Sequence, residues 1–319
     1  MTLSVRQVHM AAYRQALKAH RDLGVLGEGP VNVVSALTKA GVVVMFQPLG
    51  NLAGAYIPAP AAGTAPPGVV VNSNHPWTRQ RYTAAHELCH HLRDREAHFD
   101  TFPDGDFSRQ PIVTSDRERI AEAFASWFLM PPQLIDHMLR LIGHNGPLSG
   151  HVVFDLSQRL GTSYAATLMH LYTLGRLSQG EVTTFRKLRP SDIKQSLGGT
   201  KEHIHWNDVW VVNLDYHQAT LTMREGDQLQ IVLPESPSSG YEWIGHMPEA
   251  TTTSLEIRSP DLVGSDAHRR FAITLDGPGL CNIHLQEAQH WDPDQHNRRF
   301  SLEVLVTKRV GVDEAVLVK

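Results

Sequence analysis

The residues best suited to chemistry form one short motif, His86-Glu87-Leu88-Cys89-His90. If this segment is helical, His86 and His90 are one turn apart, so both imidazoles project from one face and can share a metal ion. Glu87 lies beside them and can accept a proton from a water molecule. The His-Glu-x-x-His pattern therefore predicts a hydrolytic metal site with Glu87 as the general base.

The surroundings of the motif favour a buried site over the alternative, a chance match on an exposed helix. Apolar or small residues flank the histidines, namely Tyr82, Ala84, Ala85, Leu88 and Leu92. A buried glutamate beside two buried histidines needs a partner. A further carboxylate is available on a later segment, where Glu118 and Glu122 are one helical turn apart. Two histidines and one glutamate leave a coordination position for water, as catalytic zinc requires.

Other polar residues near the motif are better explained by roles other than binding the metal. Cys89 lies between the histidines but turns away from them on a helix, which favours a small core residue. His91 follows His90 directly and points elsewhere, which favours a surface or supporting role. The loop after the motif could bind a second metal, although a solvated acidic loop is the favoured interpretation for its residues His98, Asp100, Asp104 and Asp106.

Helices and short strands must position the motif. Helical periodicity indicates helices over residues 5–22, 31–40, 78–92, 115–130, 134–142, 152–160 and 164–174. Short β-branched runs indicate strands at 41–46, which is expected to be buried, 56–57 and 69–71. Residues 58–68 are expected to form the tip of a hairpin and residues 96–114 a polar loop. Ser115 with Glu118 has the pattern of a helix capping box.

The composition changes after Arg189-Pro190. Alternating apolar and polar residues then indicate strands at 209–214, 219–223, 229–233, 271–275, 280–285 and 300–306. Such a series is typical of an all-β sandwich. The sequence predicts an α+β chain of three parts, with a metallopeptidase domain at 1–130, a helical, helix-turn-helix-like extension at 131–195 and the β domain at 205–319.

Residues 30 to about 175 resemble the ImmA/IrrE family of metallopeptidases, which implies a zincin-like fold with a gluzincin-like site. Three segments carry the resemblance, namely 79–90, 118–125 and 128–131. It implies that Glu118 is the third ligand of one Zn2+ per chain and that Glu87 is the base. Glu122 would lie beside the ligands, where the family usually carries Asn.

Family members typically cleave helix-turn-helix repressors in the cytoplasm, which releases stress or mobile-element genes. The helices between Val152 and Leu174 resemble the helical segment that follows the peptidase domain in this family. Arg159 and Arg176 are the only arginine or lysine residues from 152 to 176. Because a DNA-binding surface needs more positive charge, a packing role is predicted for this segment.

Residues from about 205 to 310 resemble chagasin-type inhibitors of cysteine peptidases, which implies an immunoglobulin-like fold. The segment 233–243 and Trp291 carry the resemblance. It implies partner-binding loops that contain Ser236, Pro237, Gly240, Tyr241 and Trp291. Gln289-His290 precede Trp291 where the family usually has Arg-Pro. Because this change removes a charged contact and a rigid element, weak inhibition and a docking role are predicted.

Composition and charge exclude several classes of protein. With 41% hydrophobic and 19% charged residues, the chain has ordinary globular composition rather than that of a disordered protein. A net charge of -4 gives no overall attraction to nucleic acid or anionic membrane. No run reaches the ~18 apolar residues of a membrane span, and the start lacks the apolar core of a secretory signal. Cys89 and Cys281 are too few for a disulfide framework, so a cytoplasmic location is expected.

Together these patterns predict a cytoplasmic zinc endopeptidase that cleaves a protein, with a helix-turn-helix repressor as its substrate in stress or mobile-element regulation. Two alternatives stay open. In one, the zinc site is vestigial and the β domain inhibits a cysteine peptidase, although the intact set of His86, Glu87, His90 and Glu118 argues against decay. In the other, the protein sequesters its repressor without cutting it.

Overall fold

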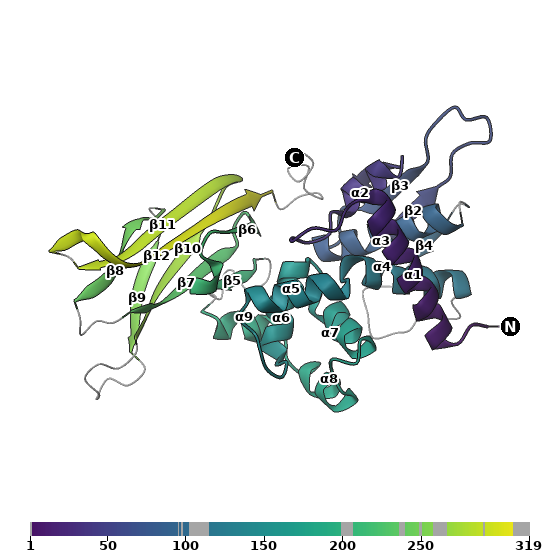
Figure 1. Ribbon diagram of the computed structural model, residues 1–319. Helices are drawn as coiled ribbons and strands as arrows, with labels where there is room; N and C mark the ends of the chain where they lie inside the picture. Colours follow the sequence, from purple (N-terminus) through teal and green to yellow (C-terminus); the bar gives the residue numbers. More distant parts are fainter. Residues whose placement is uncertain are drawn as a thin grey trace. The chain divides into compact units, whose positions relative to one another are not determined.

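The computed structural model (Figure 1) describes residues 2–94, 96, 98–101, 115–198, 207–235, 240–248, 251–257, 267–289 and 291–308. The chain forms two compact units. The first comprises Met1–Met138 and Leu148–Lys187, and the second comprises Leu139–Pro147 and Leu188–Arg309. The finer division at 1–130, 131–195 and 205–319 stays a prediction. Within the described part of the chain, no helix is long and apolar enough to cross a membrane.

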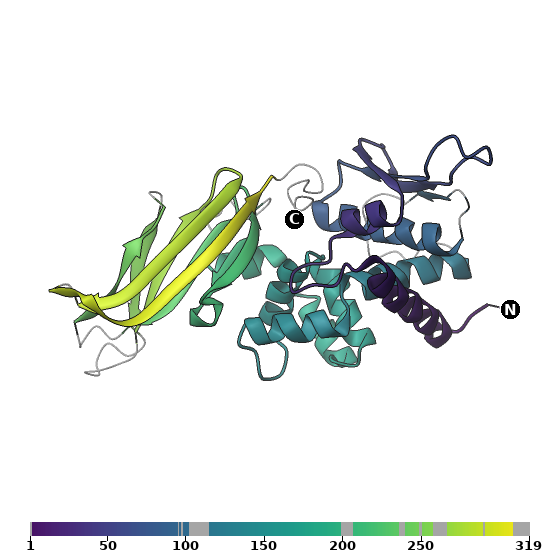
Figure 2. The same cartoon turned by 45° about the horizontal axis from the view of Figure 1, so that its top comes forward.

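A four-stranded sheet forms one layer of the first unit, with the strands in the order β1, β3, β2, β4. The strands are β1 Val43–Gln47, β2 Leu52–Ile57, β3 Gly68–Asn72 and β4 His98–Thr101. β1 runs parallel to β3, whereas β2 is antiparallel to β3 and β4. The β2–β3 pair confirms the predicted hairpin. Helices of this unit gather on one side of the sheet (Figure 2).

Helix α3, Trp77–Arg93, packs directly on β2 and β3. A Cβ atom at Gly54 of β2 would overlap the Thr83 side chain of α3, so glycine permits this close approach. On the same strand, the hydroxyl group of Tyr56 lies 3.0 Å from Nδ1 of His91. The motif helix is therefore fixed against the sheet by both shape and hydrogen bonding.

The other helices before residue 188, of which only α5 extends past the first unit, are α1 Val5–Leu23, α2 Val33–Lys39, α4 Asp116–Leu129, α5 Pro132–Leu141, α6 Gly150–Leu160, α7 Tyr164–Thr173 and α8 Gln179–Phe185. α1 begins with a capping box formed by Ser4 and Gln7. Its small buried residues, which include Ala12 and Ala16, allow close packing against α4. α4 begins at Asp116 and Ser115 is its N-cap, as predicted, because the Ser115 hydroxyl accepts a hydrogen bond from an amide of the first turn.

A buried arginine links α3 to the helix-turn-helix-like segment. Arg81 of α3 donates to the carbonyl of Gly161, at 3.0 Å, in the turn between α6 and α7, and to the carbonyl of Val31, at 2.9 Å. The two basic residues of the segment are also engaged in ion pairs. Arg159 contacts Asp155 at 2.9 Å with its side chain almost fully buried, and Arg176 contacts an aspartate of α5. These contacts support the predicted packing role.

The second unit contains two four-stranded sheets that share one hydrophobic core. Their strand orders are β5, β7, β10, β9 and β6, β12, β11, β8. The elements are α9 Pro190–Ser196, β5 Val209–Val212, η1 Leu214–Tyr216, β6 Ala219–Arg224, β7 Gln228–Glu235, β8 Tyr241–His246, β9 Thr252–Ile257, β10 Ala267–Thr274, β11 Gly279–Gln289 and β12 Asp292–Thr307. Leu229, Ile231 and Leu233 of β7 are fully buried, which confirms that alternate residues face the core.

Several details differ from the sequence-based expectations. β1 was predicted to be buried, but Val43 and Met45 are 48% and 47% exposed because β1 is an edge strand. β4 lies within the predicted polar loop, and it forms through pairing with β2 rather than through a strong local pattern. The rest of that loop, at 102–114, lies outside the described residues. Helices α8 and α9 and strand β9 were not predicted.

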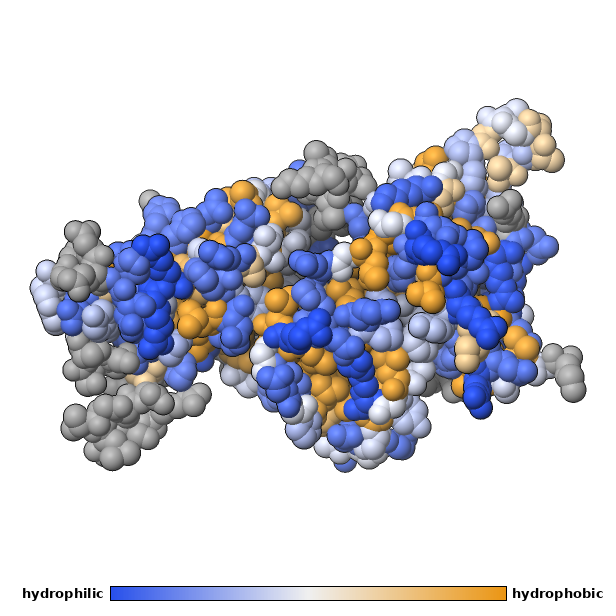
Figure 3. Space-filling model, viewed as in Figure 1, coloured by the Kyte–Doolittle hydropathy of each residue, from blue (hydrophilic) through white to orange (hydrophobic). Residues whose placement is uncertain are grey.

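Hydrophobic side chains reach the surface in separate patches between hydrophilic ones (Figure 3). Scattered apolar residues of this kind are normal on a folded protein. The most exposed large apolar side chain among the described residues is that of Trp291, at 71%. Its exposure leaves it available to a partner.

A buried histidine in the first unit predicts a loss of stability in mild acid. Nε2 of His170 on α7 lies 3.0 Å from the carbonyl oxygen of Met130. Burial lowers the pKa of His170 to about 4, against about 6.5 in an unfolded chain. Above about pH 6.5, His170 is neutral in both the folded and the unfolded state, so it does not change the free energy of unfolding. As the pH falls from about 6.5 to about 4, the unfolded chain gains a proton that the folded protein does not, so the free energy of unfolding decreases.

We expect this residue to contribute about 2 kcal/mol of the difference in unfolding free energy between about pH 7.5 and about pH 5. Urea unfolding of the wild type and of His170→Gln at both pH values measures it. Glutamine keeps a donor for the Met130 carbonyl but does not titrate, so the variant should show a weaker pH dependence by that amount. An equal pH dependence in both proteins would contradict the prediction.

Candidate metal centre

The two motif histidines lie on one buried face of α3, as the spacing predicted. Their Nε2 atoms are 3.1 Å apart. His86 and His90 are both buried, and His90 has no exposed surface. The rings are therefore held by packing, with one nitrogen of each directed toward the other.

Glu118 completes the cluster from the first turn of α4. Its Oε2 atom lies 3.4 Å from Nε2 of His86 and 3.6 Å from Nε2 of His90. The three residues could hold a metal ion, because their ligand atoms all lie within 4.8 Å of one another. The Glu118 side chain is 23% exposed, so the cluster opens toward solvent on this side. The predicted capping box is only half formed, since Ser115 caps the helix while the Glu118 carboxylate turns to the histidines.

Glu87 is fully buried beside the cluster. A Cβ atom at Gly54 would be only 3.6 Å from Oε1 of Glu87, so the carboxylate lies against the backbone of β2. Its position on α3, next to His86, matches the one predicted for the general base. That role stays a prediction.

Two residues that the sequence interpretation missed support His90. Nδ1 of His90 is 3.0 Å from Oδ2 of Asp94, the residue at the carboxyl end of α3. Nε of Arg117, at the start of α4, is 2.9 Å from the same oxygen. The signal available in the sequence was the i, i+4 spacing of His90 and Asp94, which places the two side chains on one helix face.

The other predicted residues near the motif have different surroundings. Glu122 follows Glu118 by one turn, and its side chain is exposed. Its backbone carbonyl accepts a hydrogen bond from the Tyr82 hydroxyl at 2.8 Å, which joins α4 to α3. Cys89 is fully buried, and burial raises the pKa of its thiol to about 12. A thiol with such a pKa stays protonated, which agrees with the predicted core role.

The predicted partner-binding loops of the β domain are described only in part. Ser236 and Pro237 lie outside the described residues. Gly240 has a left-handed φ of 71°, and a Cβ atom there would overlap the ring of Trp291. Tyr241 begins β8. The structure thus brings Gly240 and Trp291 together, while their role in binding stays a prediction.

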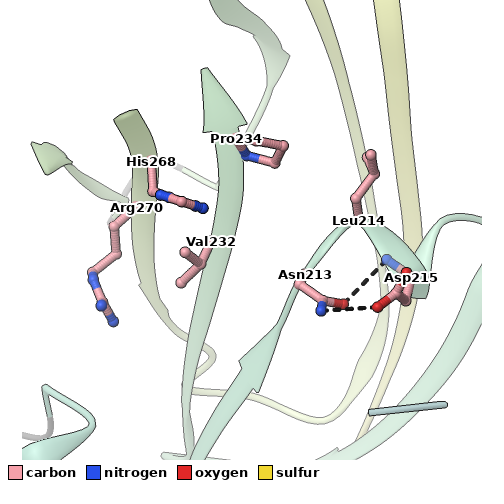
Figure 4. A pocket seen from close by; sticks show the side chains of 7 residues that line it. All are labelled: Asn213, Leu214, Asp215, Val232, Pro234, His268 and Arg270. Carbon is pink, nitrogen blue, oxygen red and sulfur yellow. Dashed lines mark hydrogen bonds between the residues drawn. The ribbon is translucent and has the colours of Figure 1, made fainter. Parts of the chain in front are cut away.

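A pocket of about 400 Å3 lies in the second unit (Figure 4). It is lined by Asn213, Leu214, Asp215, Val232, Pro234, His268 and Arg270. Asn213 and Asp215 form two hydrogen bonds with each other, at 3.0 and 3.1 Å. Among the described residues, the one cluster with the donors for a metal ion is that of His86, His90 and Glu118, so this pocket is no second candidate.

Similar solved structures include the cysteine protease inhibitor EhICP2 from Entamoeba histolytica and Amebosin. The EhICP2 alignment has 20% identity, covers 31% of this chain and 96% of that chain, and has a TM-score of 0.29. The Amebosin alignment has 26% identity, covers 31% of this chain and 98% of that chain, and has a TM-score of 0.27.

Two family models and two curated relatives match separate parts of the chain. Residues 37–172 match the peptidase M78 family, the IrrE N-terminal-like domain, and residues 222–304 match the chagasin family peptidase inhibitors, I42. Amoebiasin-1 from Entamoeba histolytica is 27% identical over 96 residues, which cover 29% of this chain and 94% of that protein. Radiation response metalloprotease IrrE from Deinococcus deserti is 30% identical over 135 residues, which cover 41% of this chain and 43% of that protein. This chain thus spans less than half of its IrrE relative, and it combines an IrrE N-terminal-like domain with a chagasin-like domain.

Proposed function

We propose that the protein is a zinc-dependent endopeptidase that cleaves a helix-turn-helix transcriptional repressor. The observation that carries this proposal is the cluster of His86, His90 and Glu118 with the buried carboxylate of Glu87 beside it. The match to the M78 family and the IrrE relative support a metallopeptidase. A zincin-like fold for the first domain and an immunoglobulin-like fold for the β domain belong to the same proposal.

The donor set fits zinc. Two imidazoles and one carboxylate are the ligands found in many catalytic zinc sites, where a fourth position stays open. Tetrahedral zinc with bonds of about 2.0 to 2.1 Å has ligand atoms about 3.3 Å apart. The three separations here are 3.1, 3.4 and 3.6 Å, so the side chains already lie close to that geometry. We therefore assign one zinc ion per chain to His86, His90 and Glu118.

The residues of the cluster have distinct tasks in peptide hydrolysis. Bound zinc supplies a Lewis acid that polarises the scissile carbonyl and lowers the pKa of a water molecule. Glu87 accepts the proton of the attacking water and delivers it to the nitrogen of the leaving amine. Its burial against β2 fixes the carboxylate and excludes bulk water from it. The partly exposed Glu118 leaves the solvent side of the cluster accessible to substrate.

The substrate assignment rests on the family resemblance and on the relative named for a radiation response. We infer a role in stress or mobile-element regulation in the cytoplasm, with a small helix-turn-helix protein encoded by a neighbouring gene as the first candidate substrate. Mass spectrometry of that protein after incubation with the purified enzyme tests the proposal. Defined fragments that disappear on chelation support it. An intact repressor recovered in a stable complex would favour sequestration instead.

The β domain suggests a second function, because residues 222–304 match a family of peptidase inhibitors. Trp291 is exposed next to Gly240 and could act as an aromatic anchor for a partner. However, Gln289-His290 replace the Arg-Pro pair that usually precedes this tryptophan in the family. We propose that the domain mainly holds the partner or substrate of the peptidase.

Inhibition of a papain-like enzyme by the full chain is expected to be no tighter than about micromolar, or about -8 kcal/mol. The reason is that affinity depends on a few well-buried anchors, and this chain retains Trp291 without the preceding charge and rigid proline. Steady-state inhibition of papain by the wild type and by Trp291→Ala measures this affinity. Nanomolar inhibition that disappears in the variant would make the protein a peptidase and inhibitor fusion.

A further inference from the structure

Asp94 contacts the one nitrogen of His90 that does not face the metal cluster. Nε2 of His90 points to His86 and Glu118, at 3.1 and 3.6 Å, while Nδ1 lies 3.0 Å from Oδ2 of Asp94. We infer that Asp94 is a positioning residue, which holds His90 in the tautomer and ring orientation required for metal binding. This inference rests on the proposed metal site.

The hydrogen-bonding pattern decides the tautomer. Nδ1 of His90 has two polar neighbours, Asp94 Oδ2 at 3.0 Å and Nε of Arg117 at 3.3 Å. Arg117 Nε lies closer to the Asp94 oxygen, at 2.9 Å, and a carboxylate is the stronger acceptor for a guanidinium group. Arg117 therefore forms an ion pair with Asp94, while its Nε–H group is directed at Nδ1 of His90. The contact of Nδ1 with Asp94 is the shorter of the two, and an ionised carboxylate only accepts. This contact therefore favours the proton on Nδ1 of His90, which leaves the lone pair of Nε2 for the metal.

Arg117 extends this support to the third ligand. Its Nη1 and Nη2 atoms donate to Oε2 and the backbone carbonyl of Glu96, at 2.9 and 3.2 Å, while Nε holds Asp94. Arg117 directly precedes Glu118 on α4. The ion pair between Asp94 and Arg117 thus joins the carboxyl end of α3 to the amino end of α4. This ion pair consequently fixes both the orientation of the His90 ring and the position of Glu118 relative to the histidines.

The position of Asp94 is difficult to explain by helix stability. It caps the carboxyl end of α3, where the helix dipole disfavours negative charge. Its side chain is 17% exposed, so a good part of the carboxylate is removed from water. A residue that destabilises its own helix is expected mainly at a functional site. The contacts of Asp94 with His90 and Arg117 are consistent with such a function.

Zinc affinity of two variants of nearly equal size tests the inference. Asp94→Leu removes the acceptor, whereas Asp94→Asn keeps an oxygen that can accept from Nδ1. Competition with a chromophoric chelator should show zinc binding about 10- to 100-fold weaker for the leucine variant, with the asparagine variant closer to the wild type. Asp22→Ala is the matched control, because Asp22 also lies near the carboxyl end of a helix and pairs with basic residues on α1. Its affinity should equal that of the wild type.

Thermal unfolding of the metal-free proteins separates positioning from packing. A purely structural role would destabilise both Asp94 variants without separating their zinc affinities, and that result would overturn the inference. If Asp94→Leu does not fold, Asp94→Ala takes its place. A wild type that binds no zinc would instead contradict the proposed metal site itself. If the wild type binds zinc and Asp94→Leu binds it with the same affinity, only the positioning role of Asp94 is contradicted.

Discussion

Replacing Glu87 with glutamine is expected to lower the rate of peptide cleavage by about 10²- to 10⁴-fold while zinc stays bound. Glutamine preserves the shape of a side chain that is fully buried on α3 and packed against Gly54. Its amide oxygen cannot act as the proton acceptor for the attacking water. The loss should appear in turnover, measured with a peptide that spans the cleavage site, rather than in substrate binding.

Zinc content, measured by elemental analysis, should remain at about one ion per chain in this variant, because Glu87 is not among the three residues assigned as ligands. Glu28→Gln provides the same chemical change at an exposed position of the first unit, and its turnover should match that of the wild type. Undiminished turnover by Glu87→Gln, in a preparation free of wild-type enzyme, would remove Glu87 from the mechanism.

Local patterns explain why the centre of the site could be predicted from sequence. The spacing of His86 and His90 fixes their relation within one helix turn, and no distant contact is needed to place them together. The apolar residues around them indicated burial, which the structure confirms. The β domain was predictable for a similar reason, since strands such as β11 alternate exposed and buried residues, from Asn282 to Leu285.

The remaining features depend on contacts between segments that are distant in sequence. β4 has four residues and forms because β2 offers it an antiparallel partner. Glu118 and Glu122 could both be candidates on spacing alone, and it is the packing of α4 on α3 that directs Glu118 to the histidines and leaves Glu122 exposed. The i, i+4 spacing places Asp94 near His90, but its ion pair with Arg117 depends on the packing of α4 against α3.

Removing Glu118 should cause the largest change in metal content. Its carboxylate is the one oxygen donor of the cluster, so Glu118→Ala leaves two imidazoles and no anionic ligand. Loss of an outer-shell partner costs about 10- to 100-fold in metal affinity, and loss of a direct ligand should cost at least as much. The wild type should retain about one zinc per chain through dialysis, and the variant should lose most of it.

Elemental analysis after dialysis measures this difference, with Glu28→Ala as the control for removal of a carboxylate elsewhere in the first unit. Far-ultraviolet circular dichroism should show that Glu118→Ala keeps its helices, because Ser115 still caps α4. Glu122→Ala discriminates between the two acids of α4. If zinc were lost in Glu122→Ala but kept in Glu118→Ala, the ligand would be Glu122, and α4 would have to rotate to bring that exposed side chain to the histidines. If both variants kept their zinc, the third ligand would have to be sought among the acidic residues between Glu96 and Asp116.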